Sequence, residues 1–220
     1  TSFERPNIAA ETVAELQTYD VVQMFEQAQD MDPEHRPLQG SPWRPSFLRV
    51  HLDEQQPDIA NPQVYHPGYG ATGLAWAWRR SAYEAVGGWL DFGVLGSGDW
   101  HMAFALVGNS TMSVPAVLRS GYRDAVDAWQ ERALIGIEKN VGVVKGSIRH
   151  WYHGPKERRL YGDRWKLLNQ WGFDPNTDLR QDVNTGLWLW SHTGSPRLQG
   201  LRDAVRWYHQ QRNEDDIRID

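Results

Sequence analysis

A glycine-rich stretch, GVLGSGDWHMA at residues 93–103, places a carboxylate at the predicted start of a helix. Glycines let a backbone approach a ligand closely, and the free N–H groups and dipole of a helix N-terminus hold an acidic side chain ionised. In a cleft, an ionised Asp99 is able to orient a hydroxyl group and accept its proton. The same pattern also fits an Asp99 that only caps the helix after a glycine turn, so both roles stay open.

Two histidines three residues apart, in RHWYHG at residues 149–154, follow an apolar stretch that predicts a strand. Alternate side chains of a strand point to opposite faces, so His150 and His153 are not expected to reach one metal ion unless the chain turns at Tyr152. The spacing therefore favours one ligand, His150, with His153 as the weaker candidate. A hydrogen-bonded structural histidine is the alternative at either position.

Four cationic side chains follow these histidines in KERRLYGDR, residues 156–164. Guanidinium groups bind phosphate oxygens in pairs, and Arg158 and Arg159 are the best placed for an anionic group such as a diphosphate beside a metal ion. The alternative is a solvated helix start whose cations pair with Glu157 and Asp163.

Tryptophan is unusually frequent, with 12 in 220 residues, and it recurs in pairs such as Trp76 with Trp78 and Trp188 with Trp190. A tryptophan face stacks on the apolar face of a sugar ring while its indole N–H remains available as a donor. The content therefore fits a carbohydrate-binding cleft, and burial in the core is the alternative for each tryptophan.

Composition limits the classes of function. The formal net charge of −5 gives no basic face for a phosphate backbone, so nucleic acid is not an expected partner. The chain has no cysteine, which leaves His, Asp, Glu or ligand oxygens to hold any metal and fits a cytoplasmic location. The 40% apolar residues fit one globular core, and no stretch is long and apolar enough to predict a membrane span.

Alternating short helices and strands must position these residues, and their pattern predicts an α/β layer fold. The predicted helices cover residues 9–17, 79–86, 99–107, 122–140, 159–171 and 198–212, and the predicted strands cover 21–25, 72–78, 141–151 and 187–190. The proline-rich stretch from 30 to 70 predicts a long loop with at most one or two short strands, of the kind that forms lids over substrate clefts. We divide the chain into a main region at 1–172 and a C-terminal strand and helical appendage at 173–220.

The order of these segments resembles the C-terminal half of GT-A glycosyltransferases of the family-2-like and galactosyltransferase types. The resemblance is carried by GYGATGLAWAWRRSAYEAVGGWLDFGVLGSGDWHMAFALVG, followed after a gap by GSIRHWYHG. In that family a strand and a helix lead to a glycine-pair turn, matched here by residues 87–89, and a glycine-rich loop then delivers an acidic residue, matched by Asp99. A later strand ends in a histidine that completes a divalent-metal site, which the resemblance assigns to His150.

The resemblance also implies where this sequence begins in the family pattern. Residues 1–25 are similar to the stretch that directly follows the family's metal- and nucleotide-binding Asp-x-Asp motif, and we interpret that motif as absent from this chain. The upstream nucleotide-binding strands would then be missing or belong to a separate piece. Galactosyltransferases carry consecutive acidic residues after the glycines, whereas Trp100 and His101 follow Asp99 here, so no donor sugar is carried over.

In fold, the resemblance implies the C-terminal portion of a GT-A α/β/α layer structure with added helices. In function, it implies metal-dependent transfer of a sugar from a nucleotide-diphosphate sugar to a hydroxyl of a carbohydrate or glycosylated acceptor. Mn²⁺ or Mg²⁺, with His150 as a ligand, would neutralise the leaving diphosphate, and Asp99 would act as the base. The expected diphosphate contacts are Arg158 and Arg159, and the expected substrate contacts are Trp76, Trp78, Gly98, Trp100 and His101.

Two other classes of function stay open. A carbohydrate-binding module without catalysis, or a fragment that lacks the donor site, would bind sugar with no metal or nucleotide dependence. A metal-dependent hydrolase would need His150 and His153 on one metal ion together with an aspartate.

Overall fold

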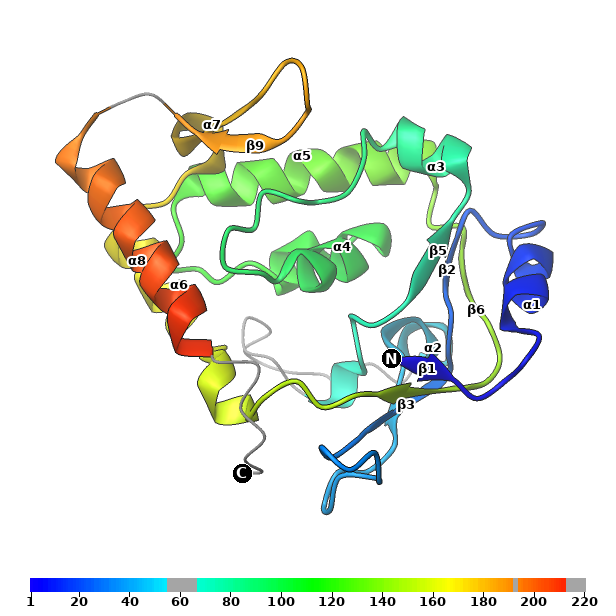
Figure 1. Cartoon of the computed structure of the whole chain (residues 1–220). Helices are drawn as coiled ribbons and strands as arrows, with labels where there is room; N and C mark the ends of the chain where they lie inside the picture. The colour runs from blue at the N-terminus through cyan, green and yellow to red at the C-terminus, as the bar shows by residue number, and fades with distance from the viewer. Residues whose placement is uncertain (55–66, 192–193, 213–220) are drawn as a thin grey trace.

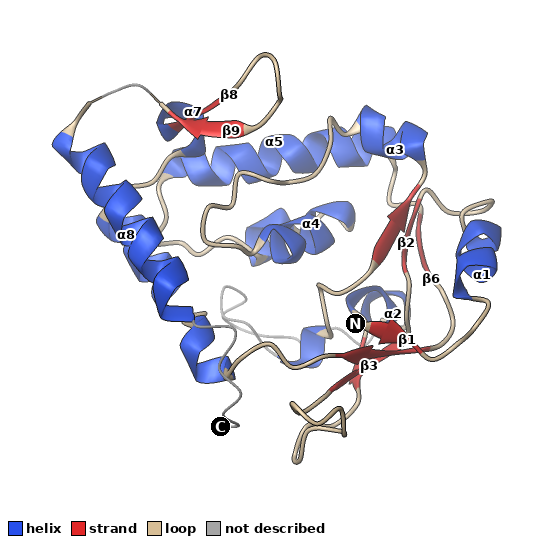
Figure 2. Cartoon of the chain, viewed as in Figure 1, coloured by secondary structure: helices blue, strands red, loops and turns tan. Residues whose placement is uncertain are grey.

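The computed structural model describes residues 1–54, 67–191 and 194–212, and its architecture is α/β (Figure 1). Most of the strands gather at one end of the molecule, beside α1 and α2, and the longer helices fill the rest (Figure 2). The helices are α1 Ile8–Glu15, α2 Phe47–Leu52, α3 Arg80–Ala85, α4 Gly98–Leu106, α5 Ser120–Gly136, α6 Asp163–Gln170, α7 Pro175–Asp178 and α8 Pro196–Arg212, with 3-10 turns η1 Pro67–Tyr69, η2 Ser110–Met112 and η3 Lys156–Arg159. The strands are β1 Ser2–Phe3, β2 Val21–Gln23, β3 Gln27–Asp30, β4 Arg44–Pro45, β5 Trp76–Trp78, β6 Val141–Val143, β7 Ser147–His150, β8 Leu179–Gln181 and β9 Trp188–Trp190.

Two chain segments, residues 21–30 and 141–150, run side by side through two small sheets. β2 pairs in parallel with β6 in a sheet of order β5-β2-β6, and β3 pairs in parallel with β7 in a sheet of order β1-β7-β3-β4. In this second ladder Asp30 is the register partner of His150. The parallel pairing therefore brings two polar residues, far apart in sequence, to the same edge of the sheet.

Helix α4 forms the centre of the core. Every residue from 100 to 106 is buried, and the helix packs against α5 (Figure 1). A helix that is apolar on all sides must be enclosed by other elements, and α4 is enclosed in this way. Asp99, in its first turn, is consequently carried by one of the most firmly held elements of the molecule.

The C-terminal segment shares this core. Leu198, Leu201 and Tyr208 of α8 belong to the same cluster of buried apolar residues as α4 and α5. The Tyr208 hydroxyl also donates a hydrogen bond of 2.9 Å to the main-chain carbonyl of Arg159. The predicted boundary between residues 172 and 173 therefore does not separate two cores, because residues 173–191 and 194–212 pack as part of the main one.

Most predicted elements are confirmed, but the predicted loop from 30 to 70 contains a helix that we did not expect. Helix α2 begins after Ser46, whose hydroxyl accepts a hydrogen bond of 3.2 Å from the amide of Arg49, and it buries Phe47, Leu48 and Val50. The proline content of this stretch masked a short amphipathic pattern. The part of the predicted loop at residues 55–66 lies outside the described residues.

Three predicted boundaries were wrong for local backbone reasons. Helix α5 ends at Gly136, before residue 140, because Glu138 and Lys139 adopt positive φ angles of 53° and 60°. The predicted strand at 141–151 is broken into β6 and β7 around Gly146, which has a φ of 125°. The helix predicted from 159 starts at Asp163, after a turn at Leu160 with a φ of 49°.

No helix in the described ranges combines the length and the apolar character that crossing a bilayer requires.

A buried chain of hydrogen bonds fixes His101 inside the core. The Ser113 hydroxyl donates its one hydrogen to the carbonyl of Ser110 at 2.7 Å, so its oxygen accepts a hydrogen bond from Nδ1–H of His101 at 3.0 Å. Because Nδ1 of His101 carries the proton, Nε2 of the same ring accepts a hydrogen bond from the Tyr122 hydroxyl at 3.0 Å. Burial, with a smaller effect of the Arg164 charge, lowers the pKa of His101 to about 3. His101 is therefore a neutral structural residue at physiological pH.

This arrangement makes stability depend on pH. In the unfolded chain the histidine pKa returns to about 6.5, so below that pH the unfolded state binds a proton that the folded state excludes. The contribution of neutral His101 to the free energy of unfolding is fully present above about pH 6.5. It is lost on acidification towards pH 3, by up to about 1.4 kcal/mol per pH unit. We expect the unfolding free energy of His101→Gln, measured by urea denaturation between about pH 4 and 6, to fall less steeply with acidification than that of the wild type. Equal slopes would contradict the assignment.

Candidate functional site

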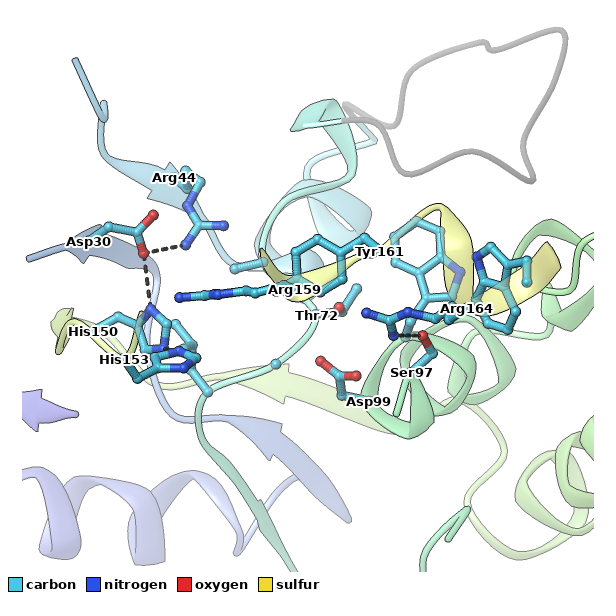
Figure 3. Close-up of a pocket in the computed structure, with 15 residues that line it drawn as sticks. Asp30, Arg44, Thr72, Ser97, Asp99, His150, His153, Arg159, Tyr161 and Arg164 are labelled. Atoms are coloured by element: carbon cyan, nitrogen blue, oxygen red, sulfur yellow. Dashed lines mark hydrogen bonds and ion pairs between the residues drawn. The ribbon is translucent and has the colours of Figure 1, made fainter. Parts of the chain in front are cut away.

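A cavity of about 490 Å³ lies between the carboxyl ends of β3 and β7, the N-terminus of α4 and the segment that leads into α6. Figure 3 shows the two histidines and Asp30 on one side of the cavity, Arg159 and Tyr161 in its middle, and Asp99 beside Ser97 and Arg164 on the other side. Of the site residues predicted from the sequence, the cavity brings together Asp99, Trp100, His150, His153 and Arg159, from segments far apart in the chain.

The two histidines converge at one end of the cavity, contrary to the expectation from strand alternation. Strand β7 ends at His150, and the chain then leaves the sheet, so that His153 turns back. The two Nε2 atoms lie 3.1 Å apart, with the rings edge to face and their centroids 4.9 Å apart. The two side chains therefore converge as a shared ligand would require, although the structure assigns no regular turn at Tyr152.

Asp30 orients the first of these histidines and was missed in the sequence analysis. Its Oδ1 lies 3.0 Å from Nδ1 of His150 and 2.8 Å from Nη2 of Arg44, and its side chain is almost fully buried. A carboxylate on Nδ1 fixes the imidazole tautomer and leaves Nε2 as the electron-pair donor. The Nε2 lone pair of His150 is therefore directed towards the space that it shares with His153.

The interpretation that the chain lacks an Asp-x-Asp triplet needs correction, because residues 30–32 have this form at the end of β3. Only Asp30 lines the cavity. Asp32 instead accepts hydrogen bonds from the amide of Arg36 at 2.8 Å and from its Nε at 2.9 Å. The triplet therefore supplies one carboxylate to the site, and that carboxylate acts on a histidine and on Arg44.

The Nε2 atoms of the histidine pair are hydrogen-bonded to each other, and their spacing equals that of two ligands on one divalent metal ion. Two imidazole nitrogens at about 2.1 Å from one ion, at an angle of about 90° to 109°, lie about 3.0 to 3.4 Å apart, and the observed separation is 3.1 Å. Searching the described residues reveals no cluster of three or more His, Asp or Glu side chains suited to a metal. Oxygens of a bound ligand or water would therefore complete the coordination, and imidazole donors favour Mn²⁺ over Mg²⁺.

Two arginines in the cavity wall carry charges that no carboxylate in the described part of the chain balances through an ion pair. Arg159 is 9% exposed and Arg164 is 5% exposed, and neither forms an ion pair with another described residue. The buried Nε atom of each has no hydrogen-bond partner in the described part of the chain. Of the predicted pair, Arg159 lines the cavity and Arg158 does not, and Arg164 is the second arginine beside Arg159 in the wall. A buried guanidinium without a counter-charge is costly unless an anion binds it.

Asp99 lies in the first turn of α4, after the N-cap residue Ser97 that bonds to Arg164, and it rests against a loop with little free space. A Cβ added at Gly73 would come within 2.7 Å of Oδ2 of Asp99, so this carboxylate rests directly on the glycine backbone. Buried Gln23 holds the loop by donating to the carbonyl of Ala71 at 2.6 Å, and the indole of Trp76 donates to the carbonyl of Thr72 at 2.9 Å. No cation among the described residues lies within ion-pair distance of Asp99.

Strained backbone is concentrated around the same cavity. Leu74 and Ser97, which line it, have φ angles of 78° and 72°, and Leu160 between Arg159 and Tyr161 has a φ of 49°. A non-glycine residue in this left-handed region costs on the order of 1 kcal/mol and is retained where the surrounding structure holds it, often at functional sites.

The remaining predicted substrate contacts are not supported. His101 is fully buried and bonded within the core, and Gly98 is a glycine because a Cβ there would lie 2.7 Å from the carbonyl of Leu90. Trp76 and Trp78 do not line the cavity, and Trp78 packs edge to face against Trp89 at 5.2 Å.

Trp100 does line the cavity, but its indole N–H is bonded to the carbonyl of Ser113 at 3.1 Å and only 8% of the residue is exposed. Its ring packs against Phe104 with the centroids 4.7 Å apart. Trp76, Trp78 and Trp100 thus pack in or against the core, as the core alternative proposed, whereas Trp165, which was not predicted, lines the cavity.

Comparison with protein-family models, with curated proteins and with solved structures gives no match, so the interpretation of the site rests on its geometry.

The uncompensated arginines predict an unusual stability effect. We expect Arg159→Met to raise the unfolding free energy of the ligand-free protein by about 1 kcal/mol, because it removes a desolvated charge without stranding a partner. Arg197→Met is the matched control: Arg197 pairs with the buried carboxylate of Asp178, so its loss should lower stability by about 3 kcal/mol. Denaturant unfolding measures both, and a marked destabilisation by Arg159→Met would contradict the idea of a built anion site.

Proposed function

We propose that this chain is the acceptor-side and metal-closing region of a metal-dependent glycosyltransferase of the GT-A type. The observation that carries the proposal is one cavity that holds the Asp99 carboxylate, a histidine pair and two arginines, Arg159 and Arg164, that form no ion pair with a described carboxylate. The donor would be a nucleotide-diphosphate sugar, and the acceptor a hydroxyl of a carbohydrate or glycosylated molecule.

In this mechanism the bond between the anomeric carbon and the diphosphate oxygen breaks while the acceptor oxygen bonds to that carbon. Arg159 and Arg164 stabilise the charge that develops on the leaving diphosphate, in a wall where water screens it poorly. Asp99 orients the acceptor hydroxyl and takes its proton. A divalent ion held by His150 and His153 would act as a Lewis acid towards the diphosphate.

A metal-dependent hydrolase is the second candidate, and the convergence of His150 and His153 favours it specifically. The two unpaired arginines favour the transferase, because hydrolysis of a neutral substrate gives them no role. A carbohydrate-binding module would likewise leave the arginines and the histidine pair without a function. Acceptor-dependent formation of a glycoside, measured by mass spectrometry, separates the transferase from the hydrolase.

Metal-dependent nucleotide binding is the first test. We expect UDP or another nucleoside diphosphate to bind more tightly with Mn²⁺ than with EDTA, as measured by quenching of tryptophan fluorescence. We expect His150→Ala to remove that difference in affinity. His209→Gln is the control, since this exposed histidine contacts the carbonyl of Val94 at 3.0 Å and does not line the cavity. Binding that ignores Mn²⁺, or a His150→Ala variant that retains the Mn²⁺ effect, would contradict the metal assignment.

The role of Asp99 is tested by two substitutions that act differently on one carboxylate. We expect Asp99→Asn to slow sugar transfer, or the slower donor hydrolysis in the absence of acceptor, by about 10²- to 10⁴-fold with little change in nucleotide binding. Gly73→Ala keeps the charge of Asp99 but displaces its carboxylate, so we expect the rate of sugar transfer to fall by about tenfold or more.

Gly162→Ala is the control, because a Cβ at that position meets nothing within 4 Å. Full activity of Asp99→Asn would show that Asp99 is only a helix-start residue.

A further inference from the structure

One aromatic ring contacts both of the cavity arginines. The hydroxyl oxygen of Tyr161 accepts a hydrogen bond of 3.2 Å from Nη1 of Arg159, and its ring face lies 4.7 Å from Cζ of Arg164. Figure 3 shows Tyr161 beside Arg159 and Arg164 in the middle of the cavity. The two guanidinium groups are therefore held by the edge and the face of the same rigid side chain.

The backbone around Tyr161 is arranged to make this contact. Leu160, with its φ of 49°, reverses the chain locally so that Arg159 and Tyr161 reach the same cavity although they are two residues apart. From the other side, the buried hydroxyl of Tyr208 in α8 holds the main-chain carbonyl of Arg159 at 2.9 Å. The position of Arg159 is thus fixed through both its main chain and its side chain.

Two guanidinium groups close to one ring repel each other, and nothing described in the protein balances them. Arg164 is held by Ser97 and by the ring, and Arg159 by the Tyr161 hydroxyl, but neither has a carboxylate partner. Without such supports each long side chain would move away from the other or towards solvent. The geometry keeps two positive charges at a fixed relation that suits a ligand with two linked anionic groups.

We propose that Tyr161 is a positioning residue that holds Arg159 and Arg164 as a two-point site, and that it makes the cavity prefer a diphosphate over a single phosphate. The inference rests on the proposed function and names the recognition element within it. A diphosphate that binds one arginine presents its second phosphate to the other at a high effective concentration, whereas a single phosphate gains no such advantage. A substitution that lets the two guanidinium groups move apart should therefore weaken the binding of diphosphate more than that of a single phosphate.

The test measures the affinities of inorganic pyrophosphate and inorganic phosphate by calorimetry, each with EDTA and again with Mg²⁺. Tyr161→Phe removes the bond to Arg159 and keeps the ring over Arg164, and Tyr161→Leu removes both contacts. We expect pyrophosphate to bind about fivefold more weakly to the first variant and about twentyfold more weakly to the second. Phosphate affinity should change by less than about twofold in either.

Tyr83→Phe is the matched control, because Tyr83 is partly exposed on α3 and does not line the cavity. It should leave both affinities unchanged. Tyr161 is 51% exposed, so both of its variants are expected to keep the thermal unfolding midpoint of the wild type.

The outcomes separate this inference from the proposed function. Unchanged pyrophosphate affinity in Tyr161→Phe and Tyr161→Leu, or equal weakening of pyrophosphate and phosphate, would overturn the positioning role and leave the transferase proposal in place. A wild-type protein that binds pyrophosphate neither with EDTA nor with Mg²⁺ would overturn both.

Discussion

A parallel ladder between residues 27–30 and 147–150 determines where the site forms. Its last pair sets Asp30 beside His150, and the hydrogen bond between them fixes the donor nitrogen of the histidine. Because β7 ends at that pair, the chain leaves the sheet after His150, and His153 lies beside His150. The segment that follows carries Arg159 and lines the cavity wall. The histidine pair and the arginine wall both follow from the register of these two strands.

The second constraint is positive charge held away from water without a counter-charge. The fold holds Arg159 and Arg164 through an αL turn, a hydroxyl group from α8 and the ring of Tyr161. Such an arrangement lowers the stability of the ligand-free protein, and proteins retain it where binding an anion compensates. Asp99, on the buried helix α4 whose N-cap residue Ser97 bonds to Arg164, adds a negative charge to the same cavity.

The sequence predicted the parts of this structure that depend on local pattern. Helix α4 and the position of Asp99 follow from a glycine turn before an apolar stretch, and α8 follows from its amphipathic period. The partnership of Asp30 with His150 was not predictable in this way, because it joins segments 120 residues apart. A direct search for Asp-x-Asp triplets would have pointed to Asp30.

The arginines that line the cavity differ from the predicted pair for a conformational reason. Arg158 and Arg159 are adjacent in sequence, but the positive φ of Leu160 and the later start of α6 bring Arg164 to the cavity instead. A residue such as leucine gives no sequence signal for a left-handed turn. Similarly, composition alone could not distinguish tryptophans that stack on ligands from those that pack in the core, such as Trp78 and Trp129.

The most direct test of the account is a crystal structure of this chain with Mn²⁺ and a nucleoside diphosphate, with anomalous data collected at the manganese edge. The account predicts an anomalous peak within coordinating distance of Nε2 of both His150 and His153, with the diphosphate oxygens on Arg159 and Arg164. A manganese ion bound elsewhere, or a nucleotide seated outside this cavity, would contradict it.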